Sequence, residues 1–139
     1  MPAEPTLLYT NAAGQLFADP NGFLRTYWAA APRTLADTQA LFTNIAQALQ
    51  ARGWGRVLVN QIGMRPFLPA EQQWVAQEWL PLAVRAGYRH GAIVVSPNVM
   101  VRLATAYVTT QVQGLPLLYR SFETETEAAQ WLLRQPVSP

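Results

Sequence analysis

The chain contains no cysteine, which excludes disulfide bonds and any metal site built on thiolates. Its single histidine, His90, has no second imidazole with which to complete a zinc site, and we interpret it as a partly exposed structural residue. Only three serines occur, Ser96, Ser121 and Ser138, and none stands in a nucleophile-elbow sequence. No motif links the carboxylates, so a catalytic pair would have to be assembled by the fold. We therefore expect no enzyme activity, no metal site and no cofactor.

Charged residues are also scarce, at 13% of the 139 residues, whereas hydrophobic residues make up 50%. The basic residues are all arginines, scattered singly from Arg25 to Arg134, and the net charge is only +2. This pattern lacks the basic stripe of a nucleic-acid-binding protein. A surface with so few charges favours burial of part of it against another protein or a second copy of the chain, so a homodimer is one expectation.

No stretch approaches the roughly 20 apolar residues that span a membrane, and the first ten residues lack the pattern of a secretory signal. We therefore expect a cytoplasmic protein without a membrane span. The length is typical of one domain, which we place at 1–139 with a short tail at 135–139.

Turn residues separate three β-prone runs at the start of the chain, 6–10, 15–18 and 23–28. The intervening Asn-Ala-Ala-Gly and Asp-Pro-Asn-Gly segments predict an antiparallel meander over 6–28.

From residue 34 to residue 134 the pattern alternates between helix and strand. Buried strands are expected at 56–62, 90–96 and 116–122. Helices are expected from the cap Thr34 to Gly53, from Pro69 to Gly87, from Ser96-Pro97 to about Tyr107, and after the cap Thr124. The fold class is therefore α/β, a mixed sheet with helices packed mainly on one face.

The helix after Pro69 carries two tryptophans that cannot share one apolar stripe. Val75, Trp79 and Leu82 fall on one face at helical spacing, which assigns Trp79 to the core. Trp74 is left on a flank, where it either packs under the loop 63–68 or anchors a protein interface. Pro81 lacks an N–H, so the helix is expected to kink or loosen there.

The segments FLPAEQQW, EWLP, AIVVSP and SFETETEAAQWL, in this order, resemble a group of small bacterial proteins with the SpoIIAA-like fold. These proteins are related to the STAS domains of anti-sigma-factor antagonists. The resemblance covers roughly residues 20–134 and is most specific at 78–81 and 129–132. It implies a four- or five-stranded mixed sheet with helices mainly on one side, and a protein-binding or regulatory role without catalysis.

The chain departs from these proteins at two positions. STAS antagonists carry a phosphorylatable serine or threonine at the start of the helix after the strand that corresponds to 56–62, but residues 64–70 contain no hydroxyl group. The small bacterial group commonly has an acidic residue at the end of that strand, where this chain has Asn60. We expect neither a phosphorylation switch nor a role for a negative charge there.

Ligands of open sheets settle beyond the carboxyl ends of parallel strands, which nominates Asn60, Arg65, Ser96 and Asn98 as binding residues. Three of them have a structural alternative: Arg65 as a solvated loop residue or the partner of a carboxylate, Ser96 as a helix cap and Asn98 as a turn residue.

Two functions remain open. The first is a regulatory or scaffolding domain that binds a protein, or itself, through the flank bearing Trp74. The second is a carrier of a small apolar or anionic molecule at the strand ends.

Overall fold

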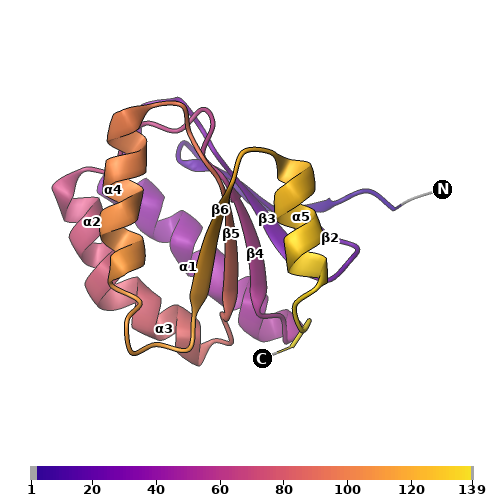
Figure 1. Ribbon diagram of the computed structural model, residues 1–139. Coiled ribbons are helices and arrows are strands. Elements are labelled where there is room, and N and C mark those ends of the chain that lie inside the picture. The colour runs from indigo at the N-terminus through magenta and orange to yellow at the C-terminus, as the bar shows by residue number, and fades with distance from the viewer. Residues whose placement is uncertain (1–2, 139) are drawn as a thin grey trace.

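The computed structural model of the chain describes residues 3–138, whose six strands lie in chain order in one sheet (Figure 1). The strands are β1 (Thr6–Thr10), β2 (Gly14–Asp19), β3 (Phe23–Trp28), β4 (Arg56–Asn60), β5 (His90–Val94) and β6 (Leu118–Phe122). The first three pair antiparallel, and β3 to β6 pair parallel. A mixed α/β sheet is thus confirmed, with six strands where the resemblance implied four or five.

Between residues 3 and 138, four helical segments accompany the sheet. They are α1 (Leu35–Arg52), a continuous segment made of α2 (Pro69–Trp74), η1 (Val75–Trp79) and α3 (Leu80–Arg85), then α4 (Val99–Thr110) and α5 (Glu125–Leu133). The parallel strands follow one another across the sheet in chain order. When the crossover connections between such strands all have the same handedness, their helices lie on the same face of the sheet. Accordingly α1 to α4 cover one face, and α5, which follows the last strand, covers the other (Figure 1).

Local sequence signals fix several helix ends. Thr34 accepts a hydrogen bond from the N–H of Asp37, whose carboxylate accepts one from the N–H of Thr34. Gly53 ends α1 in the left-handed conformation, with φ at 66°. Thr124 caps α5 by accepting a hydrogen bond from the N–H of Glu127. These helix ends agree with the prediction because they depend only on neighbouring residues.

The start of α4 differs from the prediction, which placed the cap at Ser96. Asn98 is the cap, and its Oδ1 accepts hydrogen bonds from the N–H groups of Met100 at 2.8 Å and Val101 at 3.4 Å. The Ser96 side chain is buried, and its Oγ accepts from the N–H of Asn98 at 3.0 Å. Asparagine caps helices as well as serine does, so the helix begins two residues later than expected.

The sequence predicted a kink or a loosened helix from Pro81 onward, but the irregularity lies before the proline, in the π-helical turn η1. The N–H of Leu80 donates to the carbonyl of Val75, five residues earlier, so the turn accommodates one extra residue. That residue rotates the side chains that follow by roughly 100°. Leu82, which a regular helix would place in the core, is 44% exposed, and Leu80 is fully buried instead.

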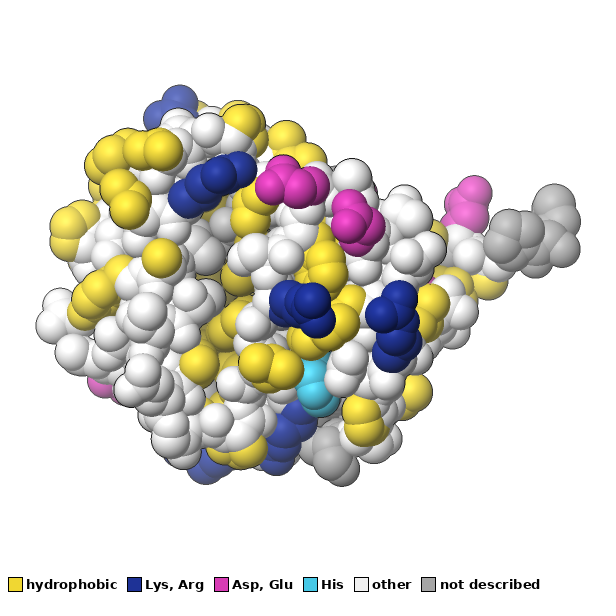
Figure 2. Space-filling model, in the orientation of Figure 1, with side chains coloured by type: hydrophobic (Ala, Val, Ile, Leu, Met, Phe, Trp, Pro, Cys, Tyr) yellow, Lys and Arg dark blue, Asp and Glu magenta, His cyan; other side chains and the backbone are white. Residues whose placement is uncertain are grey.

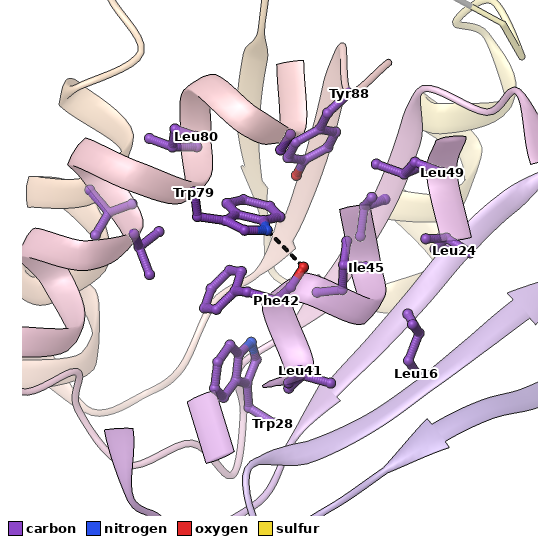
Figure 3. Packing of buried hydrophobic residues seen from close by; sticks show 14 of the residues in the cluster. Leu16, Leu24, Trp28, Leu41, Phe42, Ile45, Leu49, Trp79, Leu80 and Tyr88 are labelled. Atoms are coloured by element: carbon purple, nitrogen blue, oxygen red, sulfur yellow. Dashed lines mark hydrogen bonds between the residues drawn. The ribbon is translucent and has the colours of Figure 1, made fainter. Parts of the chain in front are cut away.

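The larger core lies between the sheet and α1 to α4 (Figure 3). Trp79 occupies its centre, as predicted, with its ring 4.5 Å from that of Phe42 between centroids and its indole N–H donating to the Phe42 carbonyl. Trp28 packs against the same phenylalanine at 5.3 Å. A smaller core, which includes Trp131 and Leu132, holds α5 against the opposite face.

Candidate ligand-binding site

A groove separates α4 from the edge of the sheet formed by β6. Helix α4 packs mainly on α2 and η1, so it stands off from the strands beside it. The groove has a volume of about 740 Å³, and Figure 2 shows the surface hollowed between α4 and β6. Gln61, Val95 and Glu123 line it, and each directly follows the last residue of β4, β5 or β6. The groove therefore reaches the carboxyl ends of three parallel strands.

A smaller cavity of about 40 Å³ lies beside the groove on the side of the core. Five residues line both spaces: Gln61, Ile93, Thr105, Thr109 and Tyr119. The rest of the cavity wall is mostly aromatic and aliphatic: Trp28, Phe42, Ile45, Val57, Val59, Phe67, Val75, Trp79 and Val108. An apolar pocket with a few convergent polar groups is typical of a small-molecule site.

The polar groups of the cavity come from three elements of the fold. The buried Gln61 follows β4, and its Oε1 accepts a hydrogen bond from the Thr105 hydroxyl of α4 at 3.1 Å. Thr26 of β3 is fully buried, and its hydroxyl has no hydrogen-bond partner among residues 3–138. The cavity thus contains one satisfied polar pair and one unsatisfied hydroxyl.

Two tyrosines close the cavity on the side of β5. The rings of Tyr88 and Tyr119 meet edge-on, with centroids 5.8 Å apart. Burial raises the pKa of Tyr119 to about 12 and raises the pKa of Tyr88 well above its usual value, so both phenols stay neutral. Gly91 makes room for them, because a Cβ there would collide with the Tyr119 ring and the Tyr88 hydroxyl. The cavity wall therefore carries no ionised group.

Charged side chains stand only along the outer groove. Arg102 donates through Nε to the carbonyl of Ser96 at 2.6 Å, and Arg120 lies over the Phe122 ring at 5.8 Å. Glu123 and Glu127 line the same groove. Two cations and two carboxylates offset each other, so the groove has no strong attraction for an anion.

The four residues nominated from the sequence have local partners. Asn60 Oδ1 accepts from the N–H of Ile62 at 3.0 Å, and Arg65 Nε donates to a loop carbonyl at 2.7 Å. Ser96 and Asn98 lie together at the start of α4. Other residues form the walls of the groove and the cavity. The nominated residues and these lining residues lie near the carboxyl ends of the same strands.

Trp74, the nominated interface residue, is half-buried at the end of α2. Its ring lies 6.1 Å from that of Phe42 between centroids, and it packs against the edge of the larger core. Its role at an interface stays a prediction.

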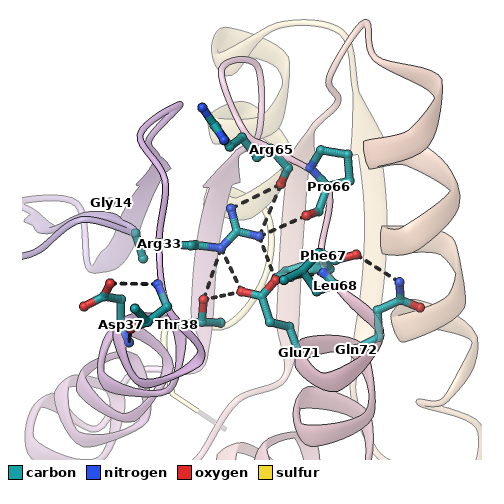
Figure 4. A network of polar contacts seen from close by, with 12 residues as sticks. Gly14, Arg33, Asp37, Thr38, Arg65, Pro66, Phe67, Leu68, Glu71 and Gln72 are labelled. Carbon is teal, nitrogen blue, oxygen red and sulfur yellow. Dashed lines mark hydrogen bonds and ion pairs between the residues drawn. The ribbon is translucent and has the colours of Figure 1, made fainter.

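A buried ion pair that the sequence did not reveal joins the loop after β3 to the first turn of α2 (Figure 4). Arg33 Nε donates to Glu71 Oε2 at 2.7 Å, and both side chains are at most 4% exposed. Glu71 also accepts from the Thr38 hydroxyl and from the N–H of Leu68. The guanidinium lies 5.3 Å from the ring of Trp28. Every one of these contacts satisfies a group within the fold, so we interpret the pair as structural.

The environment of Glu71 sets its protonation. Burial alone would raise the pKa of its carboxyl, but the hydrogen bonds from Arg33, Thr38 and Leu68 outweigh burial and lower the pKa. The carboxylate is therefore ionised at neutral pH and unsuited to act as a general base.

A second buried arginine fastens α5 to the turn between β2 and β3. Arg56 donates to the carbonyls of Leu132 at 2.8 Å and Asn21 at 2.7 Å, and burial lowers its pKa. His90 is partly exposed, as expected, and its ring meets Trp131 edge-on at 5.8 Å. Both residues serve packing at the amino ends of the strands.

Within residues 3–138, no three histidine or acidic side chains cluster in a way that could hold a metal ion. None of the helices described is both long and apolar enough to cross a membrane. Comparison of the chain with protein-family models, curated proteins and solved structures gave no match. The SpoIIAA-like resemblance accordingly stays a prediction.

Proposed function

We propose that the chain is a non-catalytic binding domain that holds a small, largely apolar molecule between α4 and the sheet. The observation that carries this proposal is the position of the groove directly beside the apolar cavity, with which it shares five lining residues. The site lies where the strands β4, β5 and β6 end, the usual position of ligands in parallel sheets. The balance of charges along the groove favours a neutral ligand over an anionic one.

Binding can be tested with the apolar dye N-phenyl-1-naphthylamine, whose fluorescence rises in an apolar site. Thr109 lines both the groove and the cavity, so Thr109→Phe should narrow the passage and weaken dye binding by tenfold or more, as roughly 1.4 kcal/mol of lost contact would. Thr110→Phe, at the exposed next position of α4, is the matched control and should leave binding unchanged. Equal binding by both variants, or no binding by the wild type, would contradict the proposal.

We also propose a regulatory role through contact with a second copy of the chain. Four apolar side chains of α4 are exposed, Val99, Met100, Leu103 and Tyr107, and apolar side chains gather over this helix in Figure 2. Val99, Leu103 and Tyr107 are spaced by four residues and so share one face. An apolar stripe on a chain with few charges favours self-association, which is one form of the protein-binding role that the STAS resemblance implies.

A further inference from the structure

The hydroxyl of Thr26 lines the cavity and has no hydrogen-bond partner among residues 3–138. The residue is fully buried on the face of β3 that carries Leu24 and Trp28, and it lines the cavity. Within residues 3–138, no atom donates a hydrogen bond to its Oγ1 or accepts one from it. A buried hydroxyl without a partner costs free energy, whereas a valine of the same shape would cost none and would suit a strand equally well.

Two other hydroxyls of the cavity already have hydrogen-bond partners. The Thr105 hydroxyl donates to Gln61, and the Thr109 hydroxyl donates to the carbonyl of Ala106 at 3.2 Å. Among the buried side-chain atoms that line the cavity, the Thr26 hydroxyl is therefore the one without a hydrogen-bond partner within residues 3–138.

The size of the cavity restricts what can enter it. A water molecule needs roughly 10–15 Å³ of such space, and a cavity that takes benzene measures about 150 Å³. At about 40 Å³, this cavity admits a slender group and excludes a ring. The bulk of the ligand must then lie in the groove outside.

We propose that the ligand is a neutral molecule with a slender, unbranched end that carries a hydroxyl or carbonyl group and hydrogen-bonds Thr26. This inference rests on the proposed function and names the chemical class of the ligand. The hydroxyl of Thr26 gains a hydrogen-bond partner only when the ligand is bound. The free energy lost by burying the unpaired hydroxyl is then offset on binding, which favours ligands that can form this bond.

The test compares two probes of similar shape, 1-pentanol and 1-chloropentane, by chemical-shift titration of the labelled protein. In the wild type and in Thr26→Val, the ratio of the two dissociation constants is measured. Loss of one hydrogen bond predicts that Thr26→Val shifts this ratio against the alcohol by about three- to tenfold. Thr110→Val, which removes an exposed hydroxyl of α4 that lines neither the groove nor the cavity, should leave the ratio unchanged.

The outcomes separate this inference from the proposed function. If both probes bind and the ratio is the same in wild type and Thr26→Val, Thr26 does not hydrogen-bond the alcohol and the inference is wrong, while the binding site stands. If neither probe nor the apolar dye binds the wild type, the proposed function fails and the inference fails with it. Thr26→Ser, which keeps the hydroxyl, should retain the wild-type ratio and serves as a second variant if the valine variant does not fold.

Discussion

Trp79 of η1 donates its indole N–H to the carbonyl oxygen of Phe42 of α1 at 2.7 Å, and the two rings pack with centroids 4.5 Å apart. The pair joins two helices that are separated by a strand in the sequence. Its hydrogen bond lies wholly in the core, where Trp79 is 3% exposed.

Trp79→Phe should therefore lower the free energy of unfolding by about 1–3 kcal/mol, through the lost hydrogen bond and the smaller ring. Urea unfolding followed by circular dichroism measures this loss without depending on tryptophan fluorescence. Trp74→Phe is the matched control, because Trp74 is half-buried at the edge of the core, and it should cost less than about 1 kcal/mol. Equal losses would show that the hydrogen bond to Phe42 contributes little.

The Arg33–Glu71 pair should make stability depend on acid. The folded state lowers the pKa of Glu71, so its contribution is complete above the ordinary glutamate pKa of about 4.3 and is lost as the pH falls through the lower folded value. Thermal unfolding between pH 7 and pH 3 should show this decline.

Glu71→Gln removes that titration and leaves the buried Arg33 without its carboxylate, which should cost about 3–5 kcal/mol at neutral pH. Its stability should then change less than that of the wild type below pH 4.3 or so. Glu125→Gln is the control, because Glu125 pairs with Arg25 at a partly exposed site and its loss should cost about 1 kcal/mol or less. A variant at Glu71 with the wild-type acid profile would exclude this carboxyl as the source.

Gly91 should be intolerant of any side chain. Gly91→Ala inserts a Cβ into the Tyr119 ring and against the Tyr88 hydroxyl, and should destabilise the protein by about 1–3 kcal/mol while changing its near-UV circular dichroism. Gly63→Ala is the control, since a Cβ there meets only the Trp28 carbonyl at 3.9 Å. If both alanine variants unfold at the same urea concentration, the tyrosines do not need the space at Gly91.

Self-association should depend on the exposed face of α4. Leu103→Gln should shift a concentration-dependent dimer toward monomer in sedimentation velocity, because Leu103 is 61% exposed at the middle of the apolar stripe. Leu82→Gln makes the same change at an exposed leucine of α3 and should have no effect.

Trp74→Ala distinguishes the alternative surface on the flank of α2, which the sequence nominated. A larger effect of Trp74→Ala than of Leu103→Gln would move the interface to that flank, and a wild type that stays monomeric at all concentrations would remove both.

Much of the fold could be predicted because the signals are local. The turns around residues 11–14 and 19–22, the caps Thr34 and Thr124, and Gly53 each act on residues within one turn of the chain. Where two local signals competed, the start of a helix could not be fixed from the sequence. Ser96 and Asn98 lie two residues apart and are both good caps, and the prediction took the wrong one.

The rest depends on contacts between distant residues. Arg33 and Glu71 are 38 positions apart, and neither has a sequence context that marks an ion pair. The cavity is assembled from four strands and three helical segments, and its existence depends on how far α4 stands from the sheet. Leu82 was misplaced because regular helical spacing contains no signal for the extra residue in η1.

Helix α4 has a different chemistry on each side: Thr105 and Thr109 face the cavity, while Leu103 and Tyr107 face outward. A small molecule bound between α4 and the sheet and a protein bound to the outer face of α4 would both contact the same helix. If the small molecule displaces α4, it changes the affinity of the chain for the docked protein. The coupling is reciprocal, so the docked protein changes the affinity for the small molecule by the same factor. Such coupling would let the chain transmit the binding of a small molecule to a protein docked on α4.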